Sequence, residues 1–298
     1  MRTLDFVSPS EIRLWSKTVE LTLLSDGRFK LDGGAMFGVV PKVLWSRVAP
    51  ADDSNRIRLA ATSTLVRTRG KNILIETGMG DKWKGGEAEM FAVEQPPTLA
   101  GSLAERGLSP EEIDYVILTH LHFDHAGGAT RRDADGRLVP TFPNARYIVQ
   151  KREWQAAGHP NDRNRASYRP ENFLPLKEHS LVDLIEGEVQ VVEGVRCRFS
   201  GGHSAGHQIV ILEGREGVAC HLGDECPTRA HIPGPWVMAY DLDPVRAMYQ
   251  KNTYMEQGWK LGWVMIAGHD PDQPLFRLRK NDKGRYESVP LDGEDALL

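Results

Sequence analysis

Residues 119–128 read THLHFDHAGG, and they follow the apolar run YVIL at residues 115–118. An apolar run of this length, bounded by turn residues, is typical of a buried strand. Three histidines and one aspartate therefore lie within a few residues of the point where a strand ends. Imidazole nitrogen and carboxylate oxygen are ligands that zinc and the neighbouring divalent metals accept. The stretch predicts a metal site at a strand exit.

The spacing within this cluster indicates which side chains can bind the same metal ion. In an extended segment His120 and His122 lie on the same side, because side chains alternate with a period of two. One metal ion can therefore bind both. Asp124 and His125 come where the chain must turn through the glycine pair at 127–128, so they can face a second ion. The alternative is a polar loop that is rich in histidine without binding a metal.

The H-x-H-x-D-H motif after a buried strand resembles that of the metallo-β-lactamase superfamily of two-metal hydrolases. The family's other ligands follow in order: a histidine in a glycine-rich turn, an aspartate after another strand and a last histidine near the C-terminus. The sequence supplies His203 in SGGHSAGH, Asp224 in LGDE and His269 in AGHD. Because His120 and His269 span half of the chain, the resemblance covers most of it.

The resemblance implies two divalent metal ions per chain, most readily zinc, although manganese, iron and cobalt also accept nitrogen and oxygen ligands. Each ion would have three protein ligands and share one carboxylate. A hydroxide that bridges the two ions would then attack an ester carbonyl. By this assignment His120, His122 and His203 bind one ion, Asp124, His125 and His269 bind the other, and Asp224 bridges them.

The resemblance also implies the fold class, which is α/β with a four-layer αβ/βα sandwich. The pattern is consistent with it, since both halves of the chain place candidate ligands at strand exits. A length of 298 residues allows one large domain or two small ones. With the family as guide, we expect a single domain over residues 1–298.

Two further segments indicate a substrate class. Residues 32–42, DGGAMFGVVPK, and residues 238–244, MAYDLDP, resemble the quorum-quenching lactonases that open N-acyl-homoserine lactones. The methyl-parathion-type organophosphate hydrolases have similar loops. Many of these lactonases carry a tyrosine three residues after the bridging aspartate, to hydrogen-bond the lactone. This chain has Pro227 at that position. A subgroup of the family also lacks the tyrosine.

Several residues are candidates for the reaction itself. Asp124 is the cluster carboxylate not needed as a bridge, so we expect it to carry the proton to the leaving alkoxide. To replace the missing tyrosine as a donor to the lactone, Tyr240 is the first choice and His231 the second. Apolar side chains near the site would form a wall for the acyl chain, or they would instead fill the core. These wall candidates are Met36, Phe37, Val39, Met79 and Trp83.

Composition excludes other classes of function. A net charge of −4 and a pI near 6.2 give no reason to expect a nucleic-acid partner. No segment approaches the roughly 18 apolar residues of a membrane span, and residues 1–20 lack a signal-peptide pattern. We therefore expect a cytoplasmic protein without a membrane partner. Three cysteines without a C-x-x-C motif predict no disulfide framework, and exposed apolar loops favour a homodimer.

Three other functions compete with lactone hydrolysis. The same site could hydrolyse phosphotriesters, because a metal-activated hydroxide attacks phosphorus as readily as carbon. It could also serve a general lactonase or esterase. From a different class, the chain could be a metal-binding module without catalysis, although such proteins usually lose ligands and none is missing here.

Local patterns predict the secondary structure around these motifs. We expect residues 158–180 to be a surface excursion and the segment after 272 to be a charged tail. The helix capped by Asp243 should end at Gln257, with Gly258 as its stop. Other helices are expected at 98–106 and 151–157, and strands at 19–24, 61–67, 72–76, 145–150, 208–212 and 218–222.

Overall fold

The computed structural model describes residues 14–15, 19–215 and 217–291, and it contains two large β-sheets. Within these residues the first sheet has seven strands in the order β1-β2-β3-β4-β5-β8-β9. Its strands are β1 Leu14–Trp15, β2 Glu20–Asp32, β3 Arg56–Thr68, β4 Lys71–Ile75, β5 Tyr115–Ile117, β8 Arg146–Gln150 and β9 Val182–Ile185. Strands β4, β5, β8 and β9 run parallel, and the strands before them pair antiparallel.

The second sheet follows the first along the chain and also has seven described strands, in the sequential order β10 to β16. Among these described strands, only β13 and β14 pair in parallel. The strands are β10 Glu188–Val192, β11 Val195–Phe199, β12 Gln208–Glu213, β13 Val218–His221, β14 Val264–Ile266, β15 Leu275–Lys280 and β16 Tyr286–Pro290. A small separate sheet pairs β6 Thr130–Arg132 with β7 Leu138–Pro140.

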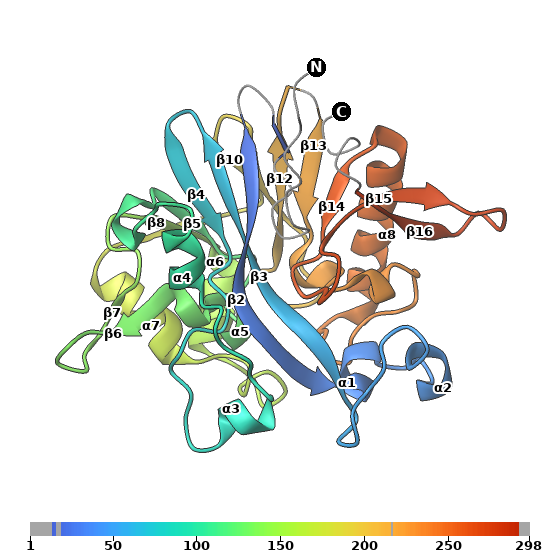
Figure 1. Cartoon of the computed structure of the whole chain (residues 1–298), viewed down its shortest axis with the longest axis horizontal. Coiled ribbons are helices and arrows are strands. Elements are labelled where there is room, and N and C mark those ends of the chain that lie inside the picture. The colour runs from blue at the N-terminus through green and yellow to red at the C-terminus, as the bar shows by residue number, and fades with distance from the viewer. Residues whose placement is uncertain (1–13, 16–18, 216, 292–298) are drawn as a thin grey trace.

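The two large sheets pack face to face, and helices cover their outer faces (Figure 1). Alternate residues of β2, such as Leu21 and Leu23, share a core with Val210 and Leu212 of β12. The helices of the first half are α4 Leu99–Ala104, α5 Phe123–Ala126, α6 Lys151–Gly158 and α7 Pro170–Glu178, and α8 Pro244–Leu261 covers the second sheet. The layers run helix, sheet, sheet, helix, so the predicted αβ/βα sandwich is confirmed.

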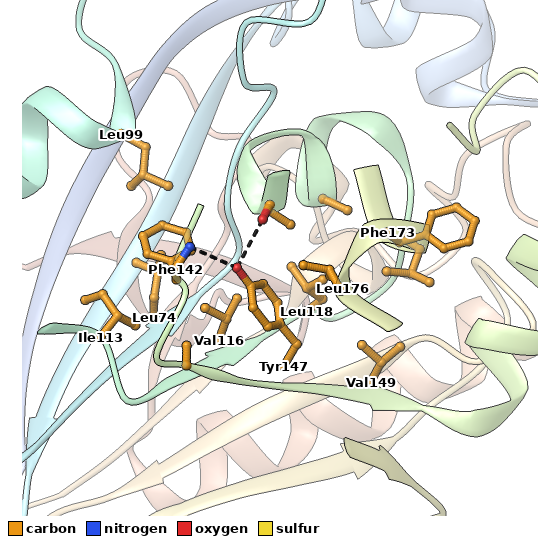
Figure 2. Packing of buried hydrophobic residues seen from close by; sticks show 14 of the residues in the cluster. Leu74, Leu99, Ile113, Val116, Leu118, Phe142, Tyr147, Val149, Phe173 and Leu176 are labelled. Carbon is orange, nitrogen blue, oxygen red and sulfur yellow. Dashed lines mark hydrogen bonds between the residues drawn. The ribbon is translucent and has the colours of Figure 1, made fainter. Parts of the chain in front are cut away.

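Apolar side chains on the outer face of the first sheet hold its helices in place. Figure 2 shows this cluster, in which Val116 and Val149 of the strands lie near Phe173 and Leu176 of α7. The Tyr147 hydroxyl is buried in this cluster. It accepts from the backbone N–H of Phe142 at 3.1 Å and donates to the Ala129 carbonyl at 3.0 Å. A buried hydroxyl with both roles filled costs little to bury.

The remaining helices are short. They are α1 Gly33–Phe37, α2 Lys42–Trp45 and α3 Glu87–Met90, with 3₁₀ turns at Pro110–Glu112, Gly127–Ala129, Gly223–Glu225 and Arg229–His231. The turn at Pro110–Glu112 has a capping box, formed by Ser109 and Glu112. Helix α1 replaces part of the loop expected over residues 32–42, because the Asp32 carboxylate accepts from the Ala35 N–H and caps it.

Three expectations about the elements were wrong. Residues 158–180 contain helix α7, which begins at Pro170 and tolerates Pro175. The segment after 272 forms the β15–β16 hairpin. Helix α8 continues past Gln257 to Leu261, because the buried Gly258 packs against Met265 and the stop is Gly262.

Among the described helices, none combines the length and the apolar character that crossing a bilayer requires. The cytoplasmic location, the homodimer and the single domain over residues 1–298 stay predictions. Part of that last range, at residues 1–13, 16–18, 216 and 292–298, lies outside the described residues.

Candidate metal centre

Histidine and aspartate side chains meet where strands of both sheets end. His120 and His122 follow β5, and α5 carries Asp124 and His125 directly after them. The second sheet contributes three loops. His203 lies between β11 and β12, Asp224 lies in the turn after β13, and His269 follows β14. Because β13 and β14 are parallel, the residues after them emerge at the same edge of the sheet.

The seven side chains are buried and close together. Three overlapping groups have one possible ligand atom per residue within 4.8 Å of one another. None of the seven residues is more than 7% exposed. The groups are His120, His122 and His203; His120, His125 and Asp224; and Asp124, His125 and His269.

The two oxygens of Asp224 face different groups. Its Oδ2 lies 3.2 Å from His203 Nε2 and 4.0 Å from His120 Nε2. Its Oδ1 lies 3.3 Å from both His125 Nε2 and His269 Nε2. A carboxylate in this position can contribute one oxygen to each of two ions.

The chemistry of these donors fits divalent metal ions. His122 Nδ1 lies 3.1 Å from His203 Nε2, and His125 Nε2 lies 2.9 Å from His269 Nε2, so imidazole nitrogens point at one another. Within the described residues, the buried Nε2 atoms of His120 and His122 have no hydrogen-bond partner. Buried polar atoms normally have a partner, and converging lone pairs favour a cation between them.

Burial and neighbouring charges leave three of these residues, His120, His122 and Asp224, in the protonation state that binds a cation. Burial, followed by the neighbouring imidazoles, lowers the pKa of His120 and His122 well below the usual range, so both are neutral with a lone pair available. Burial alone would raise the pKa of Asp224, yet His125, His203 and His269 together hold it well below its ordinary value. Asp224 is therefore an anion at the centre of the cluster.

Groups around the cluster orient the imidazoles. His203 Nδ1 donates to Asp241 Oδ1 at 2.9 Å, and His269 Nδ1 donates to the Ala60 carbonyl at 2.8 Å. Each bond leaves Nε2 facing the centre. His125 Nδ1 lies 3.4 Å from Glu76 Oε1, and that oxygen also accepts from the backbone N–H of Thr119. His207 supports the cluster from outside, since its Nε2 accepts from the Asp224 N–H at 3.0 Å.

Sequence reasoning did not assign roles to Glu76 and Asp241. Glu76 follows the buried strand β4, and an acid directly after a buried strand is a signal that could have marked it. Asp241 lies in the quoted MAYDLDP segment beside Tyr240, but nothing local shows that its carboxylate reaches His203.

The three candidates for proton transfer and substrate contact have different surroundings. Asp124 Oδ2 lies 3.6 Å from His269 Nε2, at the edge of the cluster. Tyr240 is 36% exposed, and its hydroxyl makes no hydrogen bond to any described residue. Burial of its ring, followed by the negative charges of Asp124 and Asp32, raises the pKa of Tyr240 to about 12. The hydroxyl is therefore protonated at neutral pH and can donate.

The structure corrects the choice of His231 as a substrate donor. His231 is 1% exposed and stacks on Phe37 with ring centroids 4.6 Å apart. Its Nε2–H donates to the Met36 carbonyl at 2.8 Å, and its Nδ1 accepts from the Thr228 hydroxyl at 2.8 Å. Both ring nitrogens are occupied, so no donor remains for a lactone.

The predicted substrate wall is also mostly wrong. Met36, Phe37 and Met79 are buried in one apolar cluster under the β2–β3 end of the first sheet, so they fill the core. Val39 is 90% exposed, so its place in a substrate wall stays a prediction. Trp83 is half-buried beside Phe123 of α5, with ring centroids 6.1 Å apart, so it stays near the candidate ligands.

Comparisons with known proteins agree with this geometry. The model of the metallo-beta-lactamase superfamily matches residues 56–272. The N-acyl homoserine lactonase of Bacillus cereus is 32% identical over 230 residues, which cover 74% of this chain and 84% of the lactonase.

Two solved structures are similar along most of the chain. A probable metal-dependent hydrolase from Staphylococcus aureus superposes with a TM-score of 0.80 at 32% identity, covering 92% of this chain and 98% of its own. An N-acyl homoserine lactone hydrolase with the product N-hexanoyl-L-homoserine at its catalytic metal center has a TM-score of 0.65 at 27% identity. That match covers 85% of this chain and 94% of the hydrolase.

Proposed function

This chain belongs to the metallo-beta-lactamase superfamily, and from that premise we propose that it hydrolyses the lactone ring of N-acyl-homoserine lactones. The observation that supports the proposal most is the convergence of seven buried donors, with the two Asp224 oxygens facing different groups. The likeness to N-acyl homoserine lactonases over about three quarters of the chain supports this substrate class.

The proposal includes two divalent ions per chain, with zinc as the first choice because imidazole and carboxylate suit it. His120, His122 and His203 would hold one ion, Asp124, His125 and His269 would hold the other, and Asp224 would join them. When bound, such ions lower the pKa of a water molecule held between them to near neutrality and polarise an ester carbonyl.

The side chains around the ions would divide the remaining work. Asp124 has an edge position in the cluster and can take a proton and pass it to the leaving alkoxide. The Tyr240 hydroxyl, protonated and without a partner among the described residues, can donate to the substrate carbonyl. Because the leaving oxygen of a lactone stays attached to the acyl part, the product is a single hydroxy acid.

The experiment that tests the proposal measures acid release. The zinc-loaded protein is given homoserine lactones with acyl chains of graded length, and in parallel a phosphotriester such as paraoxon. We expect a higher kcat/KM on at least one lactone than on the phosphotriester. Turnover of the phosphotriester alone would overturn the choice of lactone and favour the organophosphate hydrolase.

A matched pair of variants connects turnover to the centre. Asp224→Ala should abolish turnover and lower the metal content from about two ions per chain, while circular dichroism still reports a folded protein. Asp135→Ala makes the same chemical change in an exposed turn and should retain both. An active Asp224→Ala protein would remove the two-metal argument.

A further inference from the structure

Glu153 is a fully buried glutamate that no step of the proposed reaction uses. It lies in the first turn of α6 and is 0% exposed. Its Oε1 accepts from the Leu121 N–H at 3.0 Å and from the Tyr168 hydroxyl at 2.9 Å. Its Oε2 accepts from the Ser204 hydroxyl at 2.6 Å and from the Gly206 N–H at 3.0 Å. A carboxylate offers about four acceptor positions, and here the chain fills all of them.

The donors come from two loops that carry candidate metal ligands. Leu121 lies between His120 and His122, in the loop that leaves the first sheet. Ser204 and Gly206 follow His203, in a loop that leaves the second sheet. Glu153 therefore joins the two loops whose imidazoles must approach, and His122 Nδ1 lies 3.1 Å from His203 Nε2.

Two neighbours strengthen this connection. The Tyr168 ring lies against the His122 ring, with centroids 4.9 Å apart, while its hydroxyl donates to Glu153. Burial and the Glu153 charge both raise the pKa of Tyr168, so its hydroxyl remains a donor. A side chain at Gly206 would overlap the Glu153 backbone, so this glycine lets the His203 loop rest directly on α6.

We propose that Glu153 is a positioning residue that fixes the separation of these two loops and thereby sets the metal affinity of the His120, His122 and His203 group. The proposal deepens the proposed function and rests on its metal centre. The four hydrogen bonds of Glu153 reach no residue of the Asp124, His125 and His269 group. The effect of losing Glu153 should therefore be unequal between the two ions.

The test is a zinc titration of the metal-free protein in competition with a coloured chelator, with no substrate present. Glu153→Gln has one acceptor oxygen, and its amide would face the N–H of Leu121 or Gly206. We expect one of the two zinc equivalents to weaken roughly 10- to 100-fold, the range for groups that orient metal ligands. The other equivalent should keep the wild-type affinity. Ser204→Ala, which keeps the carboxylate and removes one donor, should weaken the same equivalent by less.

Two controls separate positioning from general stability. Glu178→Gln makes the same chemical change on the exposed end of α7 and should leave both affinities unchanged. Leu176→Ala opens the core of the same half and should lower the Tm while both equivalents still bind normally.

Three results would overturn the inference. Glu153→Gln and Ser204→Ala could both bind two equivalents with wild-type affinity, Glu153→Gln could weaken both equivalents to the same extent, or Leu176→Ala could weaken the same equivalent as much as Glu153→Gln does. Because the readout contains no substrate, a wild-type protein that binds two zinc ions but opens no lactone would overturn the proposed function alone. An active wild type with an unimpaired Glu153→Gln would overturn the positioning role alone.

Discussion

Each imidazole at the centre has a second ring nitrogen, and the partner of that nitrogen decides which one would face a bound metal. Asp241 holds His203 through Nδ1, and the Ala60 carbonyl holds His269 in the same way. Asp241 also accepts from the Met238 N–H at 2.9 Å through its other oxygen. The turn that carries Tyr240 is thus fixed to the proposed ligand His203, so the proposed substrate contact and the proposed metal site share one short segment.

Tyr240→Phe tests this placement. Loss of the hydroxyl removes the proposed donor to the substrate carbonyl, and removal of one such donor lowers turnover by roughly 100-fold or more. We expect kcat/KM on the preferred lactone to fall by about this factor, with metal content and Tm unchanged. Steady-state kinetics measures the effect. Tyr249→Phe makes the same change on the exposed face of α8 and should leave kcat/KM as it is. Equal activity of the two variants would contradict the role of Tyr240.

His231 makes the folded state sensitive to acid. Burial lowers its pKa from 6.5 to about 4, so the unfolded chain takes up a proton between these values and the folded chain does not. Stability is therefore full above pH 6.5 and is lost as the pH falls toward 4. At pH 5 the free energy of unfolding is about 2 kcal/mol lower than at neutral pH because of this one group. Urea unfolding of the metal-free protein at pH 7.5 and 5.0 should show a smaller drop in His231→Gln than in the wild type. Equal drops would assign the acid sensitivity to other groups.

Among the elements, helix α5 and the turn after it are held by the segment that follows β4. The Thr77 N–H donates to the His125 carbonyl and the Gly127 N–H donates to the Gly78 carbonyl, both at 2.8 Å. The buried Lys82 ammonium donates to the carbonyls of Gly127 and Thr130. These contacts hold α5 and the turn after it, and therefore the candidate ligands Asp124 and His125, in place against the first sheet.

Gly127→Ala should disrupt this contact, because the added Cβ would overlap the Met79 carbonyl. Backbone must move to make room, and we expect a loss of roughly 3 kcal/mol or more in the free energy of unfolding. Gly158→Ala is the matched control, since an added Cβ there has no neighbour within 4 Å among the described residues and Gly158 ends helix α6. That variant should change stability by less than about 1 kcal/mol. Chemical denaturation measures the free energy of unfolding of both variants. Similar values for the two would show that the close approach at Gly127 does not limit stability.

Across the molecule, each proposed ion joins the two sheets. His120 and His122 leave the first sheet while His203 leaves the second, and Asp124 and His125 are likewise matched by His269. Because the ligands converge only when the sheets are packed, metal binding favours the folded state over the unfolded chain.

Removing the metal should therefore lower stability as well as activity. Free zinc at 1,000 times its dissociation constant stabilises a protein by about 4 kcal/mol per site. We expect a chelator to lower the Tm measured by calorimetry and to abolish turnover, and added zinc to restore both. Magnesium is the control, because it prefers oxygen ligands and should restore neither. An unchanged Tm after verified metal removal would contradict a centre that joins the sheets.

The sequence determined the chemistry of the site and most of the local elements. Four candidate ligands follow β5 within a few residues, so the local sequence pattern and the turn residues are enough to identify them. The strands β3, β4 and β8 were predicted from the same kind of local pattern. Helix α8 was predicted but continues past Gly258, since the glycine in the left-handed conformation that ends the helix is Gly262, with a φ of 66°.

Tertiary structure alone decided which side chains support the centre and which fill the core. Glu153 bonds to Leu121 and Gly206, which lie 32 and 53 residues away along the chain. From the sequence, Met36 and Phe37 could form a substrate wall or fill the core. In the structure they are buried in an apolar cluster with residues of β2 and β3. The composition of a segment fixes what a side chain can bond to. Only the packing of distant segments fixes what it meets, because those contacts leave no period in the sequence.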